Sequence, residues 1–269
     1  MGPRVIFEDR EILVLEKPSG MIVNRSNTTV GEKTVQEWVE THLVIPNLFR
    51  DPGSDEMLKR VQHDTLEGSD FYKRSGIVHR LDKETSGILL VAKSPEAFEN
   101  LQKQFKERKV KKTYIALVHG KIKSKEGEIN VPVGRLPWNR KRFGVLAAGR
   151  EAVTKYKVLC HAELVSASLQ SRNGIPEQVR DDMKVTLLEL YPETGRTHQI
   201  RVHLKYFGHP IFADPLYGGR KTARNDRKLL PRIFLHAAKI SFNHPKSREL
   251  ISLQSPLSKE LQDFLIRLE

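Results

Sequence analysis

The chain has 269 residues, of which 38% are apolar and 29% charged, a composition typical of globular proteins with one large domain or two small ones. No apolar run approaches the ~20 residues of a membrane-spanning helix. The first residues follow a strand-like pattern instead of a secretion signal, so we expect a cytoplasmic protein without membrane association. Cys160 is the only cysteine, which excludes internal disulfides and cysteine-cluster metal sites. The formal net charge of +13 favours a polyanionic partner such as nucleic acid.

Strand-like runs dominate the chain. Runs of β-branched and apolar residues predict strands at 4–18, 87–93, 113–120, 152–159 and 185–192. Because most of these strands follow one another with few helices between them, we expect an α+β fold with a mixed, mainly antiparallel central sheet and flanking helices.

Three helices are predicted. Ser94 as N-cap and Pro95 as first residue begin a helix with Phe98, Leu101 and Phe105 on its apolar side. A second helix is expected over His198–Phe207, with Thr197 as its start signal and Gly208 as its stop. The third helix is expected to start near Ser258 at the C-terminal end.

Two segments, 44–65 and 160–183, fit this pattern poorly, and we interpret them as surface insertions in one domain spanning residues 1–269. The peptide VIPNLFRD (44–51) can be encoded so that the complementary DNA strand spells IPEQVRDD (175–182). MLKRVQHDT (57–65) can likewise be encoded so that its complement, in a shifted frame, spells CHAELVSAS (160–168). We therefore hypothesise that one mobile DNA element inserted twice in opposite orientations, at sites where loops tolerate insertion. A gene without an inverted repeat joining these codons would refute the hypothesis.

Asp82 has an unusual setting in the stretch HRLDKETSG (79–87), between Arg80 and Lys83 in a basic chain. One interpretation is structural: DKETSG forms a turn and Gly87 provides the bend. The other is chemical: a carboxylate between two cations stays ionised at neutral pH and can act as a nucleophile. No second acid lies nearby in the sequence, so neither a hydrolytic carboxylate pair nor a magnesium site is indicated.

The stretch GIVHRLDKETSGILLVAKS resembles the signature of the RluA-type pseudouridine synthases, which isomerise uridine in RNA. Four further blocks resemble this family in its order: KKTYIALVHG (111–120), VGRLPWNRKRFGVLAAGREAVTKYKVL (133–159), LLELYPETGRTHQIRVHLKYFGHPIFADPLYGG (187–219) and FLHAAKISFNHP (234–245). The resemblance implies the pseudouridine synthase fold, with a cleft for catalysis, in a compact form without the small RNA-binding S4 domain that many members carry.

The resemblance also implies roles for individual residues. Asp82 matches the catalytic aspartate, which attacks the uracil ring or the ribose C1′. Tyr114 matches a tyrosine that lies against the target base, and Arg201 an arginine that pairs with the catalytic carboxylate. Arg80 matches an arginine that fills the gap left by the extruded nucleotide. With Arg80, the expected RNA contacts are Lys83, Lys111, Lys112, Arg135, Arg140, Arg196 and His198.

Isomerisation transfers no electrons and consumes no water, so we expect no cofactor and no metal. His198 and His203 lie five positions apart on the predicted helix and point in different directions, and His79 is expected to hydrogen-bond its loop. Trp138 either packs on its own domain or stacks on a base. We expect a monomer that acts on ribosomal RNA, transfer RNA or both. The alternative is an RNA-binding or ribosome-assembly factor on the same fold; a metal-dependent nuclease would need clustered carboxylates.

Overall fold

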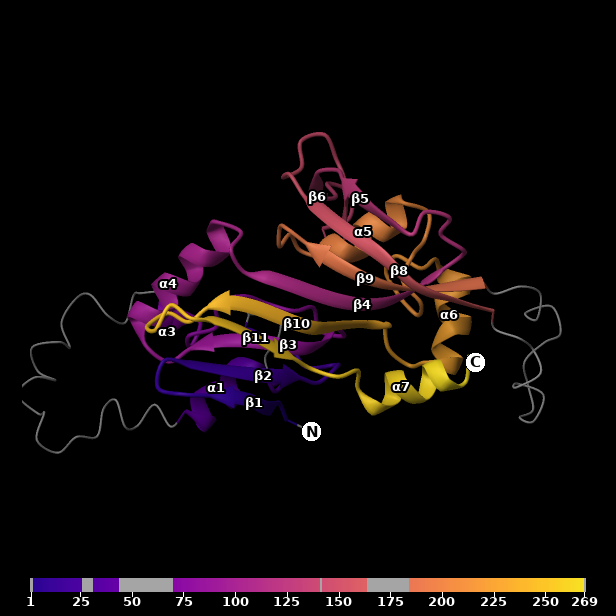
Figure 1. Ribbon diagram of the computed structural model, residues 1–269. Helices are drawn as coiled ribbons and strands as arrows, with labels where there is room; N and C mark the ends of the chain where they lie inside the picture. Colours follow the sequence, from indigo (N-terminus) through magenta and orange to yellow (C-terminus); the bar gives the residue numbers. More distant parts are fainter. Residues whose placement is uncertain (1, 26–30, 44–69, 141, 164–183, 269) are drawn as a thin grey trace, which may run out of the picture. The chain divides into compact units, whose positions relative to one another are not determined.

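The computed structural model describes residues 2–25, 31–43, 70–140, 142–163 and 184–268. The described chain divides into two compact units (Figure 1). Unit 1 comprises Met1–Val110 and Ser241–Ser255, and unit 2 comprises Lys111–Ile240 and Pro256–Glu269. Strand β10 (Leu235–Asn243) begins in unit 2 and ends in unit 1.

Unit 1 is built on an antiparallel arrangement of β1 (Arg4–Glu8), β2 (Ile12–Lys17) and β3 (Ser86–Ala92). All side chains of β3 are buried, and Leu13 and Leu15 of β2 pair with Val91 and Leu89 of β3. Strand β11 (Leu250–Gln254) pairs with β10. The described residues of this unit contain the helices α1 (Val35–His42), α3 (Asp70–Lys73) and α4 (Pro95–Lys106).

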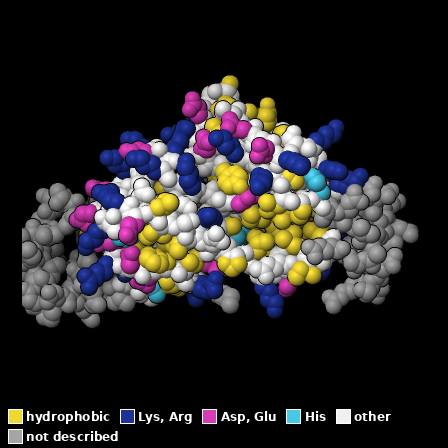
Figure 2. All heavy atoms as spheres, viewed as in Figure 1, with side chains coloured by type: hydrophobic (Ala, Val, Ile, Leu, Met, Phe, Trp, Pro, Cys, Tyr) yellow, Lys and Arg dark blue, Asp and Glu magenta, His cyan; other side chains and the backbone are white. Residues whose placement is uncertain are grey.

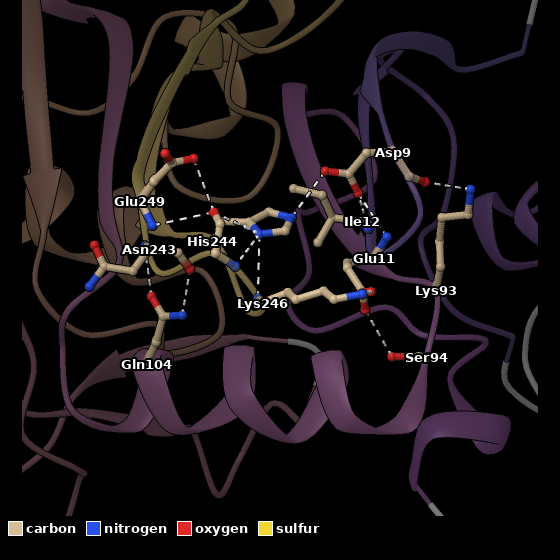
Figure 3. Close-up of polar contacts among 11 residues, drawn as sticks. Asp9, Glu11, Ile12, Lys93, Ser94, Gln104, Asn243, His244, Lys246 and Glu249 are labelled. Atoms are coloured by element: carbon tan, nitrogen blue, oxygen red, sulfur yellow. Dashed lines mark hydrogen bonds and ion pairs between the residues drawn. The ribbon is translucent and has the colours of Figure 1, made fainter.

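The predicted strand at 4–18 is a hairpin of two strands, because the side chain of Asp9 stabilises a turn between them. One carboxylate oxygen of Asp9 accepts from the backbone N–H groups of Glu11 and Ile12, each at 2.8 Å, which fixes the turn between β1 and β2. The other oxygen lies 3.0 Å from Nε2 of His244, in the turn between β10 and β11 (Figure 3). Gln104 of α4 completes the connection, since its amide both donates to and accepts from the backbone of Asn243 at 2.7 and 2.9 Å.

Unit 2 contains a further run of paired strands, in which the pairing is antiparallel from the second strand to the fifth. The strands lie in the order β10-β4-β9-β8-β5, with β4 at Lys111–His119, β9 at Lys184–Pro192, β8 at Val153–Glu163 and β5 at Glu126–Asn130. The long strands β8 and β9 run side by side (Figure 1). A separate hairpin is formed by β6 (Val133–Arg135) and β7 (Phe143–Val145).

Where unit 2 is described, its helices are α5 (Gln199–Tyr206), α6 (Arg220–Leu229) and α7 (Lys259–Ile266). The aromatic side chains of Phe212, Phe234 and Phe264 form the centre of its core, with ring centroids 5.1 Å apart for Phe212 and Phe264. Helix α7 begins after Ser258, as predicted. Among the described residues, no helix is long and apolar enough to cross a lipid bilayer.

Two helix predictions have different outcomes. Helix α4 has the predicted start: Pro95 is its first residue, and the Ser94 hydroxyl accepts from the N–H of Ala97 at 3.2 Å. The start signal predicted for α5 is wrong. His198, not Thr197, is the N-cap, with a left-handed φ of 54° and no side-chain cap.

The second poorly fitting segment begins inside a strand. The backbones of Cys160 and Glu163 continue β8 and pair with Leu187 and Lys184 of β9, after an irregularity between Val158 and Cys160. The rest of that segment (164–183) and the whole of 44–65 lie outside the described residues. The insertion hypothesis therefore stays a prediction.

The α+β class is confirmed, because both units contain antiparallel strand pairs and helices.

Candidate active site

Asp82 lies at the start of a turn that leads into β3. The N–H of Thr85 donates to the carbonyl of Asp82 at 3.1 Å, and the aspartate is half-buried. Gly87 has a φ of 111°, a conformation that favours glycine. A turn over residues 82–85 is thus confirmed, whereas Gly87, which was expected to provide the bend, lies in β3 and pairs with Lys17 of β2. This turn sets the backbone from which the Asp82 carboxylate projects.

A buried lysine, which the sequence did not single out, holds this turn. Lys17 is completely buried at the end of β2, and its ammonium donates to the carbonyls of Pro18, Met21 and Lys83 at 2.8, 2.8 and 3.0 Å. A buried cation is tolerated only when its donors are satisfied, and three carbonyls fit three ammonium protons. The Ser19 hydroxyl also donates to the carbonyl of Glu84 at 2.7 Å. Loop 18–21 therefore fixes the two residues that follow Asp82.

The cationic neighbours of Asp82 have separate surroundings. Arg80 is exposed, and Lys83 forms an exposed ion pair with Glu32 at 2.6 Å. His79 is half-buried, and its Nε2 accepts from the N–H of Leu90 in β3 at 2.9 Å. His79 forms a hydrogen bond as expected, but this bond joins it to β3 instead of to its own loop. Because Nε2 is an acceptor, protonation would break this bond.

Tyr114 and Lys112 lie in β4 of unit 2, two positions apart and therefore on the same side of the strand. Tyr114 is 9% exposed and pairs with Leu190 of β9. Burial of the Lys112 ammonium lowers its pKa to about 8, and Nζ lies 3.5 Å from the carbonyl of Thr194. At neutral pH, Lys112 is a desolvated cation close to its titration point.

Arg201 is buried in α5 and held by a carboxylate that sequence reasoning missed. Its Nε and Nη2 donate to the two oxygens of Asp214 at 2.8 and 2.9 Å, and Asp214 has no exposed surface. One of these oxygens also accepts from the N–H groups of Leu216 and Tyr217 at 2.9 and 3.1 Å. The Tyr217 ring lies 5.0 Å from the guanidinium carbon. A bidentate pair of this kind fixes the plane of the guanidinium.

The predicted partner of Arg201, Asp82, belongs to the other compact unit, and the pairing of Arg201 with Asp82 stays a prediction. The signal for Asp214 in the sequence is weak. It is a single acid between the apolar run IFA and the turn PLYGG, and nothing local links it to an arginine thirteen positions earlier.

The loop before α5 is held by a buried glutamine. Oε1 of Gln199 accepts from the hydroxyl of Thr194 at 2.6 Å and from the N–H of Arg196 at 3.0 Å. Its Nε2 donates to the carbonyl of Val153 and the hydroxyl of Thr154, both at 3.0 Å, which ties the loop to β8. This network replaces the predicted threonine cap.

His198 and His203 form hydrogen bonds with different residues. Nδ1 of His198 lies 2.9 Å from the hydroxyl of Tyr217. His203 is completely buried, and its Nε2 lies 3.1 Å from the carbonyl of Val131. Burial lowers the pKa of His203, so its ring is neutral at physiological pH and Nε2 donates to that carbonyl. In the part of the chain that the structure describes, no cluster of three histidine, cysteine or acidic side chains has the geometry to hold a metal.

The remaining predicted RNA contacts lie in unit 2. Lys111, Arg135 and Arg140 are exposed, and Arg196 is half-buried with its Nε donating to the carbonyl of Glu151 at 3.0 Å. Figure 2 shows Lys and Arg side chains at many places on the face in view, with Asp and Glu among them. The charge on this face therefore does not by itself mark one binding site.

Known proteins share this chain's sequence and fold. The family described as RNA pseudouridylate synthase matches residues 11–206. Ribosomal large subunit pseudouridine synthase D of Nitrosomonas europaea is 36% identical over 265 residues, which cover 97% of this chain and 64% of that protein. Ribosomal large subunit pseudouridine synthase C of Vibrio parahaemolyticus is 36% identical over 267 residues, covering 98% of this chain and 69% of that protein.

Two solved human structures have the same fold. RNA pseudouridylate synthase domain containing 1 superposes with a TM-score of 0.65 and 24% identity, covering 98% of this chain and 87% of that one. Domain containing 4 gives a TM-score of 0.62 and 21% identity, covering 98% and 92%. The predicted resemblance is confirmed: the chain belongs to the RNA pseudouridylate synthase family.

Proposed function

We propose that the protein isomerises specific uridines in structured RNA to pseudouridine. The observation that carries this proposal is the family match over residues 11–206, which contains Asp82, Tyr114 and Arg201 in the motifs quoted above. The names of its relatives point to large-subunit ribosomal RNA as the first substrate to test, with transfer RNA as the second.

In the proposed reaction, the carboxylate of Asp82 attacks either C6 of the uracil or C1′ of the ribose. The bond between N1 and C1′ breaks, the base rotates, and a bond forms between C5 and C1′. The bond between Asp82 and the substrate breaks, which regenerates the carboxylate. The proton on C5 leaves, with Tyr114 as the proposed acceptor, and N1 gains a proton. The product has the composition of the substrate, so the reaction needs neither an oxidant nor a hydrolytic water.

Asp82 must remain an anion and keep one direction for this attack. The hydrogen bond from the Lys17 ammonium to the carbonyl of Lys83 supports the fixed direction of attack, because it holds the backbone directly after the aspartate. We assign the first requirement to Arg201, a cation whose guanidinium plane is fixed by the bidentate pair with Asp214. Asp214 then acts through Arg201 and does not touch the substrate.

A uridine in folded RNA is stacked, and turning it out costs a few kcal/mol. We propose that Arg80 fills the gap in the RNA and that the other predicted contacts offset this cost by binding phosphates: Lys83, Lys111, Lys112, Arg135, Arg140, Arg196 and His198. Lys83 must exchange Glu32 for phosphate, which costs little because exposed ion pairs contribute about 0–1 kcal/mol.

The test uses large-subunit ribosomal RNA transcribed with tritium at C5 of uridine. An isomerase releases the label to water, because C5 exchanges its hydrogen for the bond to ribose. Release by the wild-type protein in the presence of EDTA supports the proposal and excludes a metal-dependent nuclease. Tight RNA binding without release from ribosomal or transfer RNA would instead indicate an RNA-binding or assembly factor.

A further inference from the structure

The described residues between β6 and β7, 136–140 and 142, form a tip that presents an aromatic side chain to solvent. Trp138 in this tip is 76% exposed, more than any other large apolar side chain in the described ranges. The tip is held by backbone bonds from Leu136 to Arg142 at 3.0 Å and from Arg142 to Asn139 at 2.9 Å. An ordered turn therefore holds the indole outward.

Its exposure decides between the two interpretations of Trp138. Tryptophan is the side chain with the largest area to bury, and a ring packed on its own domain would lose most of its exposure. The adjacent Pro137, Asn139 and Arg140 are exposed as well, so the tip does not cover the ring. Packing against its own domain is thus excluded for Trp138.

The charge around Trp138 indicates the kind of partner. The sequence from Val131 to Arg150 contains five Lys and Arg residues and no Asp or Glu. Arg135 and Arg140 are exposed and lie three positions before and two positions after Trp138 in the sequence. The guanidinium of Arg135 lies 5.2 Å from the centre of the Phe143 ring. An exposed aromatic ring among cations matches a single-stranded nucleic acid, whose bases stack while its phosphates bind the cations.

The base of the hairpin is joined to the residues that hold Arg201. The Tyr217 hydroxyl accepts from the N–H of Phe143 in β7 at 3.0 Å and also contacts His198 at the start of α5. Arg142 donates to the carbonyl of Leu216, in the turn that Asp214 closes. Within unit 2, hydrogen bonds therefore connect the tip to the residues around α5, the helix that carries Arg201.

We propose that Trp138 is a stacking platform for an unpaired base of the RNA whose uridine the protein isomerises, with Arg135 and Arg140 binding the adjacent phosphates. This inference rests on the proposed function and adds a residue that selects RNA with an unpaired base. Duplex RNA offers no such base, because its bases are stacked on each other.

Fluorescence tests the stacking directly, because Trp38 is the only other tryptophan in the chain. Trp38 lies on α1 in unit 1, stacked on His42 at 4.4 Å. In a Trp38→Phe variant of the full chain, all indole emission comes from Trp138. We expect short single-stranded RNA to quench this emission and the perfect duplex of the same sequence to leave it unchanged. In the converse Trp138→Phe variant, quenching by single-stranded RNA should be lost.

Activity provides the second readout. Stacking contributes about 1–3 kcal/mol per base, so Trp138→Ala should raise KM for RNA by roughly fivefold to more than a hundredfold. The kcat of this variant should be that of the wild type. Trp138→Phe, which keeps an aromatic ring, should have a KM between those of the wild type and Trp138→Ala. Tyr206→Ala is the matched control, since this tyrosine is 61% exposed at the end of α5 and should leave KM unchanged. Equal melting temperatures would show that both variants fold.

The outcomes separate the two proposals. If the wild-type protein releases tritium but RNA at saturation leaves the Trp138 emission unchanged, the stacking inference is overturned and the isomerase stands. An unchanged KM for Trp138→Ala overturns it equally, and the exposed indole then serves another partner. Quenching by single-stranded RNA, combined with no tritium release from labelled ribosomal or transfer RNA, supports stacking and refutes the isomerase.

Discussion

The buried pair of Asp214 and Arg201 gives the sharpest stability prediction. Replacing Asp214 with asparagine keeps the size of the side chain but removes its charge and turns one oxygen into a donor. Oδ1 accepts from Nη2 of Arg201 and from the N–H groups of Leu216 and Tyr217, so the asparagine oxygen stays there and its amide nitrogen faces Nε. Two donors then point at each other beside a buried cation that has lost the negative charge of Asp214.

Breaking a buried ion pair in this way costs about 3 kcal/mol, the lower end of the usual range because the other oxygen is kept. For a chain of this size, that loss should lower the apparent melting temperature by roughly 6–12 °C. Asp70→Asn is the matched control, because Asp70 is exposed and its ion pair with Arg74 at 3.4 Å contributes little. Circular dichroism during heating measures both. A wild-type melting temperature for Asp214→Asn would refute the assignment of this pair as the anchor of α5.

Three further outcomes are expected. Lys17→Met should lower the urea midpoint by an amount equivalent to about 3 kcal/mol and reduce kcat, because three carbonyls lose the ammonium donor and only that of Lys83 keeps a described backbone donor, the N–H of Gly20. An unchanged midpoint contradicts the assigned role of Lys17. Lys112→Met should raise the melting temperature at pH 7. The depressed pKa makes the charged lysine destabilising below about pH 8, and this penalty is relieved between pH 8 and 10.5, so the gain of the variant should vanish over that window; a gain independent of pH contradicts the desolvation account. Arg140→Ala should lower the slope of RNA affinity against salt by roughly one unit, whereas the exposed Arg10→Ala should not; equal slopes argue against a phosphate contact at Arg140.

Elements with strong local signals could be predicted from the sequence. Helix α4 has its cap and apolar side within one short stretch, and β9 has an uninterrupted strand pattern, so both were placed within a residue or two. Helix α6 was missed because its inward side consists of Ala223 and Asp226 and gives no apolar periodicity. Asp226 anchors that helix through His119 at 2.8 Å and the N–H of Ala213 at 3.0 Å. Contacts between residues so far apart leave no local pattern to detect.

The candidate active site also contains residues that the sequence predicted and residues that depend on distant contacts. The resemblance supplied Asp82, Tyr114 and Arg201 by matching motifs. The residues that hold them were missed, because Lys17 and Asp214 act through partners brought close only by folding. A buried lysine in LEKP and a buried aspartate in FADPLYGG look like ordinary polar residues until their environment is known. Exposure likewise settled the position of Trp138, which its sequence left open.

The central claim is that the Asp82 carboxylate performs the chemistry. It is tested most directly by single-turnover tritium release from C5-labelled ribosomal RNA with the wild-type protein, Asp82→Asn and the control Asp70→Asn, all at saturating protein. The account predicts equal release by the wild-type and Asp70→Asn proteins, and none by Asp82→Asn despite unchanged RNA affinity. Release by Asp82→Asn at the wild-type rate would contradict it.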